Sequence, residues 1–106
     1  MVSEATIIKA AELLREAAHP TRIILFGSHA RGVAQSDSDV ALMVILPKVR
    51  DRMAEMVRLN RILSSLRVPV DLLVVSEEVF EYWANTPGNV YFEVAVEGRV
   101  LYEQAA

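Results

Sequence analysis

Apolar residues recur along the chain at two different spacings, and their order predicts alternating helices and strands. The first segment has helical spacing, with Ser3 in a position that suits an N-cap and Pro20 at its end. Its apolar residues are Ile7, Ala10, Ala11, Leu14, Ala17 and Ala18. The run Arg22 to Phe26 is short, apolar and β-branched, so we expect a buried strand there. Residues 27–38 contain Gly and Ser and no long apolar run, which predicts a short helix or a loop.

The second half of the chain continues this alternation. Asp39 to Leu46 predicts a second strand, and Asp51 to Leu66 predicts an amphipathic helix. The core-facing residues of that helix are expected to be Met53, Met56, Leu59, Leu63 and Leu66. We then expect a strand over 70–75, a helix from Ser76 to Trp83, a turn over 85–89, a helical turn or two over 90–97, and a short edge strand over 99–102. This order predicts an α/β or α+β fold, a small mixed sheet with flanking helices and a mostly three-stranded core.

Length and charge narrow the classes of function. At 106 residues the chain matches a single domain, 1–106, so any large substrate must dock on its surface. Its 11 Lys and Arg are scattered and are outnumbered by 14 Asp and Glu, so we expect no direct nucleic-acid binding. The absence of Cys fits a reducing compartment, with the cytoplasm as the default. We also expect no signal peptide and no membrane contact, because no apolar run approaches the length of a membrane span.

A Gly-Ser pair at the end of the first strand is a candidate phosphate site. Gly27 and Ser28 leave a predicted buried strand and enter a helix or loop. Backbone N–H groups at a helix start have no partners within the helix, and the Ser hydroxyl stands beside them. Gly-Ser is also ordinary turn material, so the pair alone does not distinguish a phosphate site from a turn.

Two carboxylates on strands add a second kind of chemistry. Asp39 begins a strand in which Asp39, Ala41, Met43 and Ile45 share one face. Asp71 lies within an apolar strand, where the pattern predicts burial and therefore a partner or a metal. Because Mg²⁺ binds a few carboxylates together with substrate phosphates and water, the Gly-Ser turn and the two Asp together favour a Mg²⁺ site. The alternative for Asp71 is a structural partner, an Arg or a backbone donor.

These motifs together resemble a known signature. Gly27-Ser28-His29-Ala30-Arg31-Gly32, followed by Ser38-Asp39-Val40-Ala41-Leu42, is similar to the signature of the minimal nucleotidyltransferases of the DNA polymerase beta superfamily. Their pattern is Gly-Ser, ten residues, then Asp-x-Asp, with a third Asp on a later strand. Ten residues separate Ser28 from Asp39 here, and Asp71 stands where the third Asp belongs. The resemblance extends to residues 85–102 and implies a polymerase-beta-like nucleotidyltransferase fold.

The resemblance also implies an activity and a role for each residue. Members of the family use two Mg²⁺ ions to transfer a nucleotide from ATP to an acceptor hydroxyl. On that pattern Asp39 and Asp71 are the catalytic and metal-binding residues, and Gly27, Ser28 and Arg31 bind the nucleotide. For Arg31 the alternative is that it braces the loop by pairing with a carboxylate. Asp37 is expected to be a solvated loop residue, and His29 an exposed loop residue.

A partner follows from the same resemblance. Minimal nucleotidyltransferases are commonly paired with a HEPN ribonuclease toxin, which they silence by adenylylating a tyrosine. The resemblance therefore implies an antitoxin that forms a hetero-oligomer with its toxin. The aromatic and Met side chains outside the motif are expected to serve the core or an interface rather than to bind a nucleobase. They are Met53, Met56, Tyr82, Trp83, Tyr91 and Phe92.

One position departs from the signature. The second Asp of Asp-x-Asp falls at position 41, and this chain has Ala41, which offers no oxygen to a metal. We therefore expect little or no transfer activity. The otherwise intact motif favours a deliberate Asp-to-Ala replacement over a natural loss, and the sequence leaves both open. It also leaves open a binding module that neutralises its partner by covering it, and a purely structural role for the Gly-Ser turn and the carboxylates.

Overall fold

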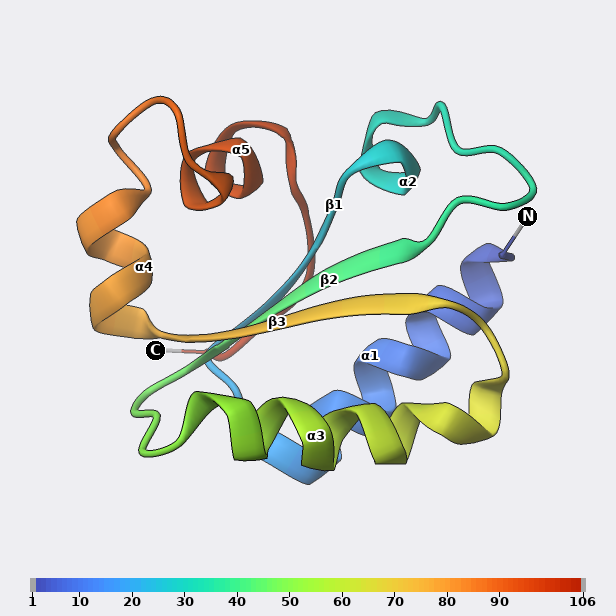
Figure 1. Ribbon diagram of the computed structural model, residues 1–106, viewed down its shortest axis with the longest axis horizontal. Coiled ribbons are helices and arrows are strands. Elements are labelled where there is room, and N and C mark those ends of the chain that lie inside the picture. The colour runs from blue at the N-terminus through green and yellow to red at the C-terminus, as the bar shows by residue number, and fades with distance from the viewer. Residues whose placement is uncertain (1, 106) are drawn as a thin grey trace.

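Residues 2–105, which the computed structural model describes, form a four-stranded sheet with helices on both faces (Figure 1). The elements are α1 (Glu4–Ala18), β1 (Arg22–Phe26), α2 (Ser28–Arg31), β2 (Val40–Leu46), α3 (Arg52–Leu63), the 3-10 turn η1 (Ser64–Leu66), β3 (Val70–Ser76), α4 (Glu77–Trp83), α5 (Val90–Glu97) and β4 (Arg99–Glu103). The predicted order of helices and strands is confirmed, and with it the predicted class of fold. Among residues 2–105 no helix has the length and apolar character needed to cross a bilayer.

Side-chain caps fix where four of the helices begin. Ser3 accepts a hydrogen bond from the backbone N–H three residues later, and Asp51, Ser76 and Asn89 do the same for α3, α4 and α5. These caps satisfy backbone donors that have no partner inside the helix. At the other end of α1, His19 takes a left-handed conformation with φ 49° and directs the chain into β1.

The sheet is mixed, with the strand order β3-β2-β1-β4. β1 is antiparallel to both β2 and β4, whereas β2 and β3 are parallel and are joined through α3. Parallel neighbours need such a crossover connection. None of the five residues of β4 is buried, so three strands supply the core of the sheet, as the sequence predicted.

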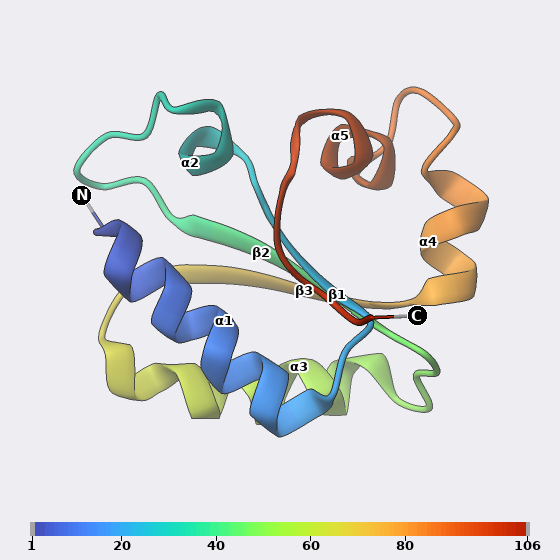
Figure 2. The same ribbon diagram turned by 180° about the vertical axis from the view of Figure 1, so that it is seen from behind.

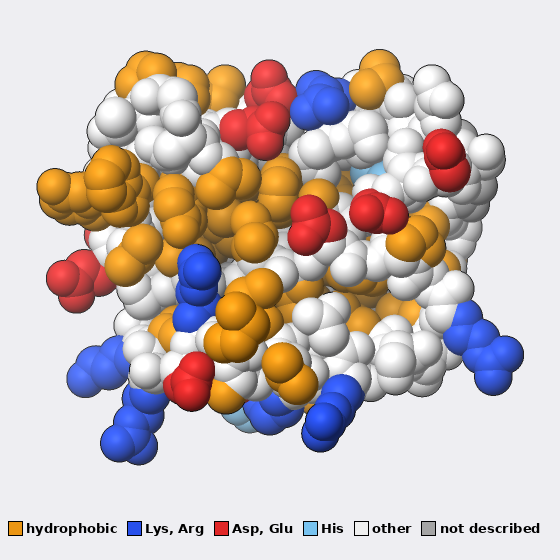
Figure 3. Space-filling model, in the orientation of Figure 1, with side chains coloured by type: hydrophobic (Ala, Val, Ile, Leu, Met, Phe, Trp, Pro, Cys, Tyr) orange, Lys and Arg blue, Asp and Glu red, His pale blue; other side chains and the backbone are white. Residues whose placement is uncertain are grey.

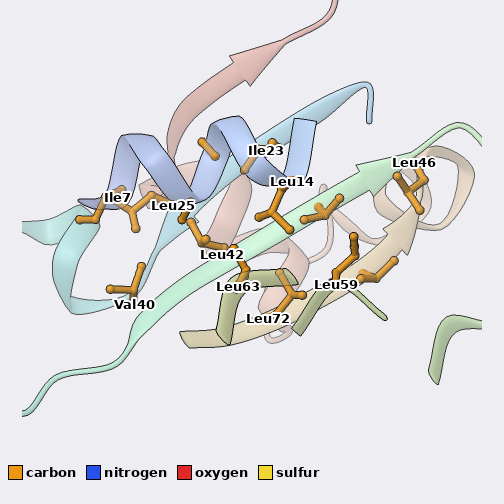
Figure 4. Close-up of a cluster of buried hydrophobic side chains, with 14 residues drawn as sticks. Ile7, Leu14, Ile23, Leu25, Val40, Leu42, Leu46, Leu59, Leu63 and Leu72 are labelled. Carbon is orange, nitrogen blue, oxygen red and sulfur yellow. The ribbon is translucent and has the colours of Figure 1, made fainter. Parts of the chain in front are cut away.

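One face of the sheet is covered by α1 and α3, which lie side by side (Figure 2). Alternate residues of the strands point to this face and meet the apolar sides of both helices (Figure 4). Leu59 and Leu63 of α3 are buried there, as predicted. Met53 is 64% exposed, so its predicted core position was wrong. The loop before α3 places Val49 against this core, and Met53 lies outside it.

The opposite face is only partly covered. Met43, Ile45 and Val75 point to it and pack with Phe80 of α4 and Val94 of α5. Those two helices lie over the end of the sheet where β3 finishes (Figure 1). At the other end, where β2 and β3 start, Ala41 is half-buried and Asp71 is exposed. The fold thus leaves one end of this face open.

Candidate active site

Three chain segments meet at this open end because of the directions in which the strands run. β1 is antiparallel to β2, so the end of β1 lies beside the start of β2, and Phe26 pairs with Ala41. β3 is parallel to β2, so its start lies there as well, and Ala41 pairs with Asp71. The turn at Gly27, the approach to β2 at Asp39 and the start of β3 are therefore brought together. These are the segments in which the sequence placed its candidate residues.

Gly27 makes the turn from β1 into α2. Its backbone has φ 73° and ψ −155°, a region that essentially only Gly adopts. A Cβ built on Gly27 would lie 3.5 Å from the Cβ of Ala41, so the turn passes close to the open face. Ser28 starts α2, and no side chain caps this helix. The turn therefore lies beside Ala41, and the backbone N–H groups at the start of α2 have no partner inside the helix, which suits phosphate oxygens.

The two carboxylates lie in the solvent. The prediction that Asp71 is buried was wrong, because β3 is an edge strand and Asp71 is its second residue, at the end of the sheet face that α4 and α5 do not cover. Asp39, just before β2, is exposed as well. Within residues 2–105 neither carboxylate pairs with a basic side chain, so the structural alternative of an Arg partner for Asp71 does not hold. Figure 3 shows acidic side chains together in the middle of this face.

The spacing of these carboxylates suits one hard cation. Asp39 stands two residues before the register partner of Asp71, which places the two Cα atoms about 8 Å apart on neighbouring strands. Two such side chains, completed by phosphate oxygens and water, form the kind of set that Mg²⁺ prefers. The part of the chain that the structure describes holds no group of three or more His, Cys, Asp or Glu arranged to bind a metal. Ala41, where the sequence resemblance puts a further Asp, offers no oxygen to a cation.

Arg31 is engaged by α5. Its Nη1 lies 3.5 Å from Oε2 of Glu97 and 3.8 Å from Oε1 of Glu93. The three side chains are nearly half exposed, so these pairs contribute at most about 1 kcal/mol. The contact braces α2 against α5, which is the alternative role considered for Arg31. No sequence pattern signals it, because the partners are more than sixty residues apart. Phosphate binding by Arg31 stays a prediction, and the two carboxylates would compete with the phosphate for the guanidinium.

The loop between α2 and β2 folds back on itself. Ser38 Oγ accepts a hydrogen bond from the backbone N–H of Gln35 at 2.8 Å, and Nε2 of His29 lies 3.4 Å from the carbonyl oxygen of Ser38. His29 therefore lies half-buried in α2, so the prediction of an exposed loop residue was wrong. Asp37 is an exposed loop residue, as predicted. The contact between His29 and Ser38 joins α2 to the residue just before Asp39.

Comparison with known proteins supports the sequence resemblance. The family described as "Nucleotidyltransferase domain" matches residues 7–101, a range that includes every candidate site residue named above. A protein of Methanocaldococcus jannaschii that bears the name of a protein adenylyltransferase is 33% identical over 81 residues, which are 76% of this chain and 77% of that protein.

Solved structures with the same fold include two complexes of a toxin with its antitoxin. One is a crystal structure of a toxin–antitoxin with AMP-PNP, in which the matching chain has a TM-score of 0.65 and 25% identity, over 97% of this chain and 75% of that one. The other is a tri-AMPylated HEPN toxin of Shewanella oneidensis in complex with an MNT antitoxin. It matches with a TM-score of 0.62 and 20% identity, over 95% of this chain and 72% of that one.

Proposed function

The chain belongs to the nucleotidyltransferase domain family, and from that premise we propose that it is the antitoxin of a toxin–antitoxin pair. The proposed activity is the Mg²⁺-dependent transfer of AMP from ATP to a tyrosine of a cognate HEPN ribonuclease toxin. We propose that residues 1–106 are a single domain that acts in the cytoplasm as a hetero-oligomer with the toxin. The AMP-PNP in one structural neighbour and the AMPylated toxin in another support this choice of donor and partner.

One observation supports the chemistry more than any other. The Gly27-Ser28 turn, Asp39 and Asp71 come from three separate segments, and the strand register gathers them at one solvent-open end of the sheet. A triphosphate seated there has its oxygens near the donors of the turn. Asp39 and Asp71 would hold a divalent cation there, and the cation would neutralise part of the triphosphate charge. An open end also lets a macromolecular acceptor approach.

The candidate site residues have different roles in the proposed transfer. Gly27 and Ser28 hold the phosphates of ATP, and Asp39 helps to hold the cation with which the triphosphate binds. Asp71 accepts the proton of the acceptor hydroxyl. The oxygen of that hydroxyl attacks the α-phosphorus of ATP, and pyrophosphate leaves. Asp71 suits this role because its carboxylate is exposed at the open end.

Ala41 makes the chain as it stands a poor catalyst. It is the register partner of Asp71 and lies beside Gly27, where a carboxylate would face both the phosphates and the other acids. Loss of groups that merely support a metal ligand costs about 10–100-fold, so loss of a ligand itself is expected to cost more.

The test is transfer of label from α-labelled ATP to the toxin of the same pair. We expect the Ala41→Asp form to label the toxin in Mg²⁺ and the unsubstituted chain to label it at least about 100-fold more slowly. A toxin with its acceptor tyrosine changed to Phe is the control for the acceptor. Equal rates for the two forms would contradict the proposed impairment.

The absence of a carboxylate at Ala41 favours a second candidate function, that of a binding module without catalytic activity. A chain that lacks one metal ligand can still neutralise its partner by covering it. Tight stoichiometric inhibition of the toxin without ATP, with no transfer by the Ala41→Asp form, supports this binding module and overturns the enzyme. Inhibition by substoichiometric amounts of the Ala41→Asp form, dependent on ATP, supports the enzyme.

A further inference from the structure

α4 exposes large apolar side chains to solvent in addition to the one that it buries. Phe80 is its buried residue, whereas Val79 is 40% exposed, Tyr82 is 73% exposed and Trp83 is 43% exposed. The rings of Tyr82 and Trp83 meet edge to face with their centroids 4.9 Å apart. These side chains line a hollow of about 410 Å³ together with Glu78 and Glu81. Large aromatic side chains grouped on the surface mark an interaction site rather than a packing need.

The surroundings of this patch are acidic. Residues 76–98, which include α4 and α5, contain five Glu and no Lys, Arg or His. Glu93 and Glu97 are paired with Arg31, but none of the three Glu of α4 forms an ion pair within residues 2–105. An acidic rim repels nucleic acid phosphates and anionic lipid. It complements a protein surface that surrounds an apolar socket with Lys and Arg.

The α4 patch is continuous with the candidate active site. Figure 3 shows a band of hydrophobic side chains that runs from α4 across the partly covered face to the acidic side chains in its middle. β3 links the two ends, because it carries Asp71 near its start and leads directly into α4. Five strand steps separate Asp71 from Ser76, or about 17 Å. α4 adds at most about 10 Å between Ser76 and Tyr82 or Trp83. An interface of about 800 Å² per partner is roughly 30 Å across and therefore spans both.

We propose that the exposed apolar side chains of α4 and its three Glu dock a basic surface of the protein acceptor, so that the acceptor's hydroxyl lies over Asp71. This inference rests on the proposed function, since the HEPN toxin is taken as the acceptor. Tyr82 and Trp83 anchor the contact, and the Glu side chains orient it. Docking of the acceptor on α4, at one end of β3, then positions the acceptor hydroxyl over Asp71 at the other end of the strand.

The experiment uses the fact that Trp83 is the single Trp of the chain. Labelling with 5-fluorotryptophan gives one ¹⁹F resonance, which is followed during titration with the HEPN toxin. In parallel, calorimetry measures the affinity of the toxin for the unsubstituted chain, for Tyr82→Ala, and for the double variant Glu78→Lys with Glu81→Lys. Met53→Ala is the matched control, because Met53 is equally apolar and 64% exposed but lies on α3. Thermal melting checks that each variant is folded, and AMP-PNP binding checks the active site separately.

We expect the Trp83 resonance to shift on binding, and the α4 variants to weaken the toxin affinity about tenfold or more while Met53→Ala leaves it unchanged. The loss in the charge-reversal variant should shrink as salt is raised. If all variants bind the toxin equally and the resonance does not move, the docking inference is overturned while the proposed function stands. If the unsubstituted chain does not bind the toxin, the inference is also overturned. Transfer of label by the Ala41→Asp form then decides the enzyme function on its own.

Discussion

Ala41 lies directly opposite Asp71 in the parallel register of β2 and β3, on the open face of the sheet. Asp39 shares that face two residues earlier. A carboxylate at position 41 would therefore stand between Asp39 and Asp71, close to the turn at Gly27. The consequences of this arrangement for charge, cation binding and stability can be measured without the toxin.

Ala41→Asp should make the stability of the fold depend on Mg²⁺. Without a cation the third carboxylate repels its neighbours, and a like-charge pair on adjacent strands costs up to about 1 kcal/mol, which lowers Tm by up to about 4–8 °C. Mg²⁺ with AMP-PNP should raise the Tm of this form more than that of the unsubstituted chain. Differential scanning calorimetry measures both effects. Ala41→Asn, which adds bulk without charge, should show neither the initial loss nor the larger gain.

Asp71→Asn should weaken Mg²⁺-dependent AMP-PNP binding about tenfold or more, because it removes one of the two carboxylates that we propose as cation ligands. Titration calorimetry with and without Mg²⁺ measures the change. Asp37→Asn removes the same charge from an exposed loop near the site and serves as the control. Equal losses for the two variants would show that overall charge, rather than a ligand, is responsible.

Gly27→Ala should destabilise the fold by about 1–3 kcal/mol, because its backbone lies in a region that side chains avoid. Urea denaturation measures the loss. Gly88, with φ 99° and open space around it, is the matched control. Gly88→Ala should also cost stability, but it should leave AMP-PNP affinity unchanged because Gly88 lies outside the site. Preserved affinity in Gly27→Ala, once folded, would count against phosphate binding at this turn.

The two roles considered for Arg31 make opposite predictions. If Arg31 only braces α2 against α5, Arg31→Met and the double variant Glu93→Gln with Glu97→Gln should each cost less than about 1 kcal/mol of stability, and neither should change AMP-PNP affinity at high salt, where the effects of distant charges are screened. If Arg31 binds phosphate, Arg31→Met should weaken AMP-PNP binding, whereas the Gln variant should strengthen it by releasing the guanidinium. Calorimetric titration of the three forms distinguishes these outcomes. Because phosphate binding by Arg31 is our prediction, we expect the second of these outcomes.

The sequence correctly predicted those features that depend on interactions between residues close together in the chain. Ser3 and Ser76 cap the helices that they were expected to begin, and the alternation in β2 points Met43 and Ile45 to the face predicted for them. Errors arose where neighbours distant in sequence decide exposure. Asp71 lies in an apolar run and was expected to be buried, and Met53 was placed in the core by its spacing. Periodicity shows which residues share a side of an element but does not show what covers that side.

The sequence by itself determined the elements, the Gly-Ser and Asp motif, and the absence of a carboxylate at Ala41, because these depend on residue identity and short spacing. The tertiary structure alone decided that β3 is an edge strand with Asp71 in solvent and that Arg31 is held by α5. It also left Tyr82 and Trp83 exposed on α4. The reason is physical: strand order and helix placement result from burying apolar area across the whole chain. The burial of apolar area across the whole chain decides which faces of the sheet stay exposed. The short-range pattern of apolar and polar residues does not hold this information.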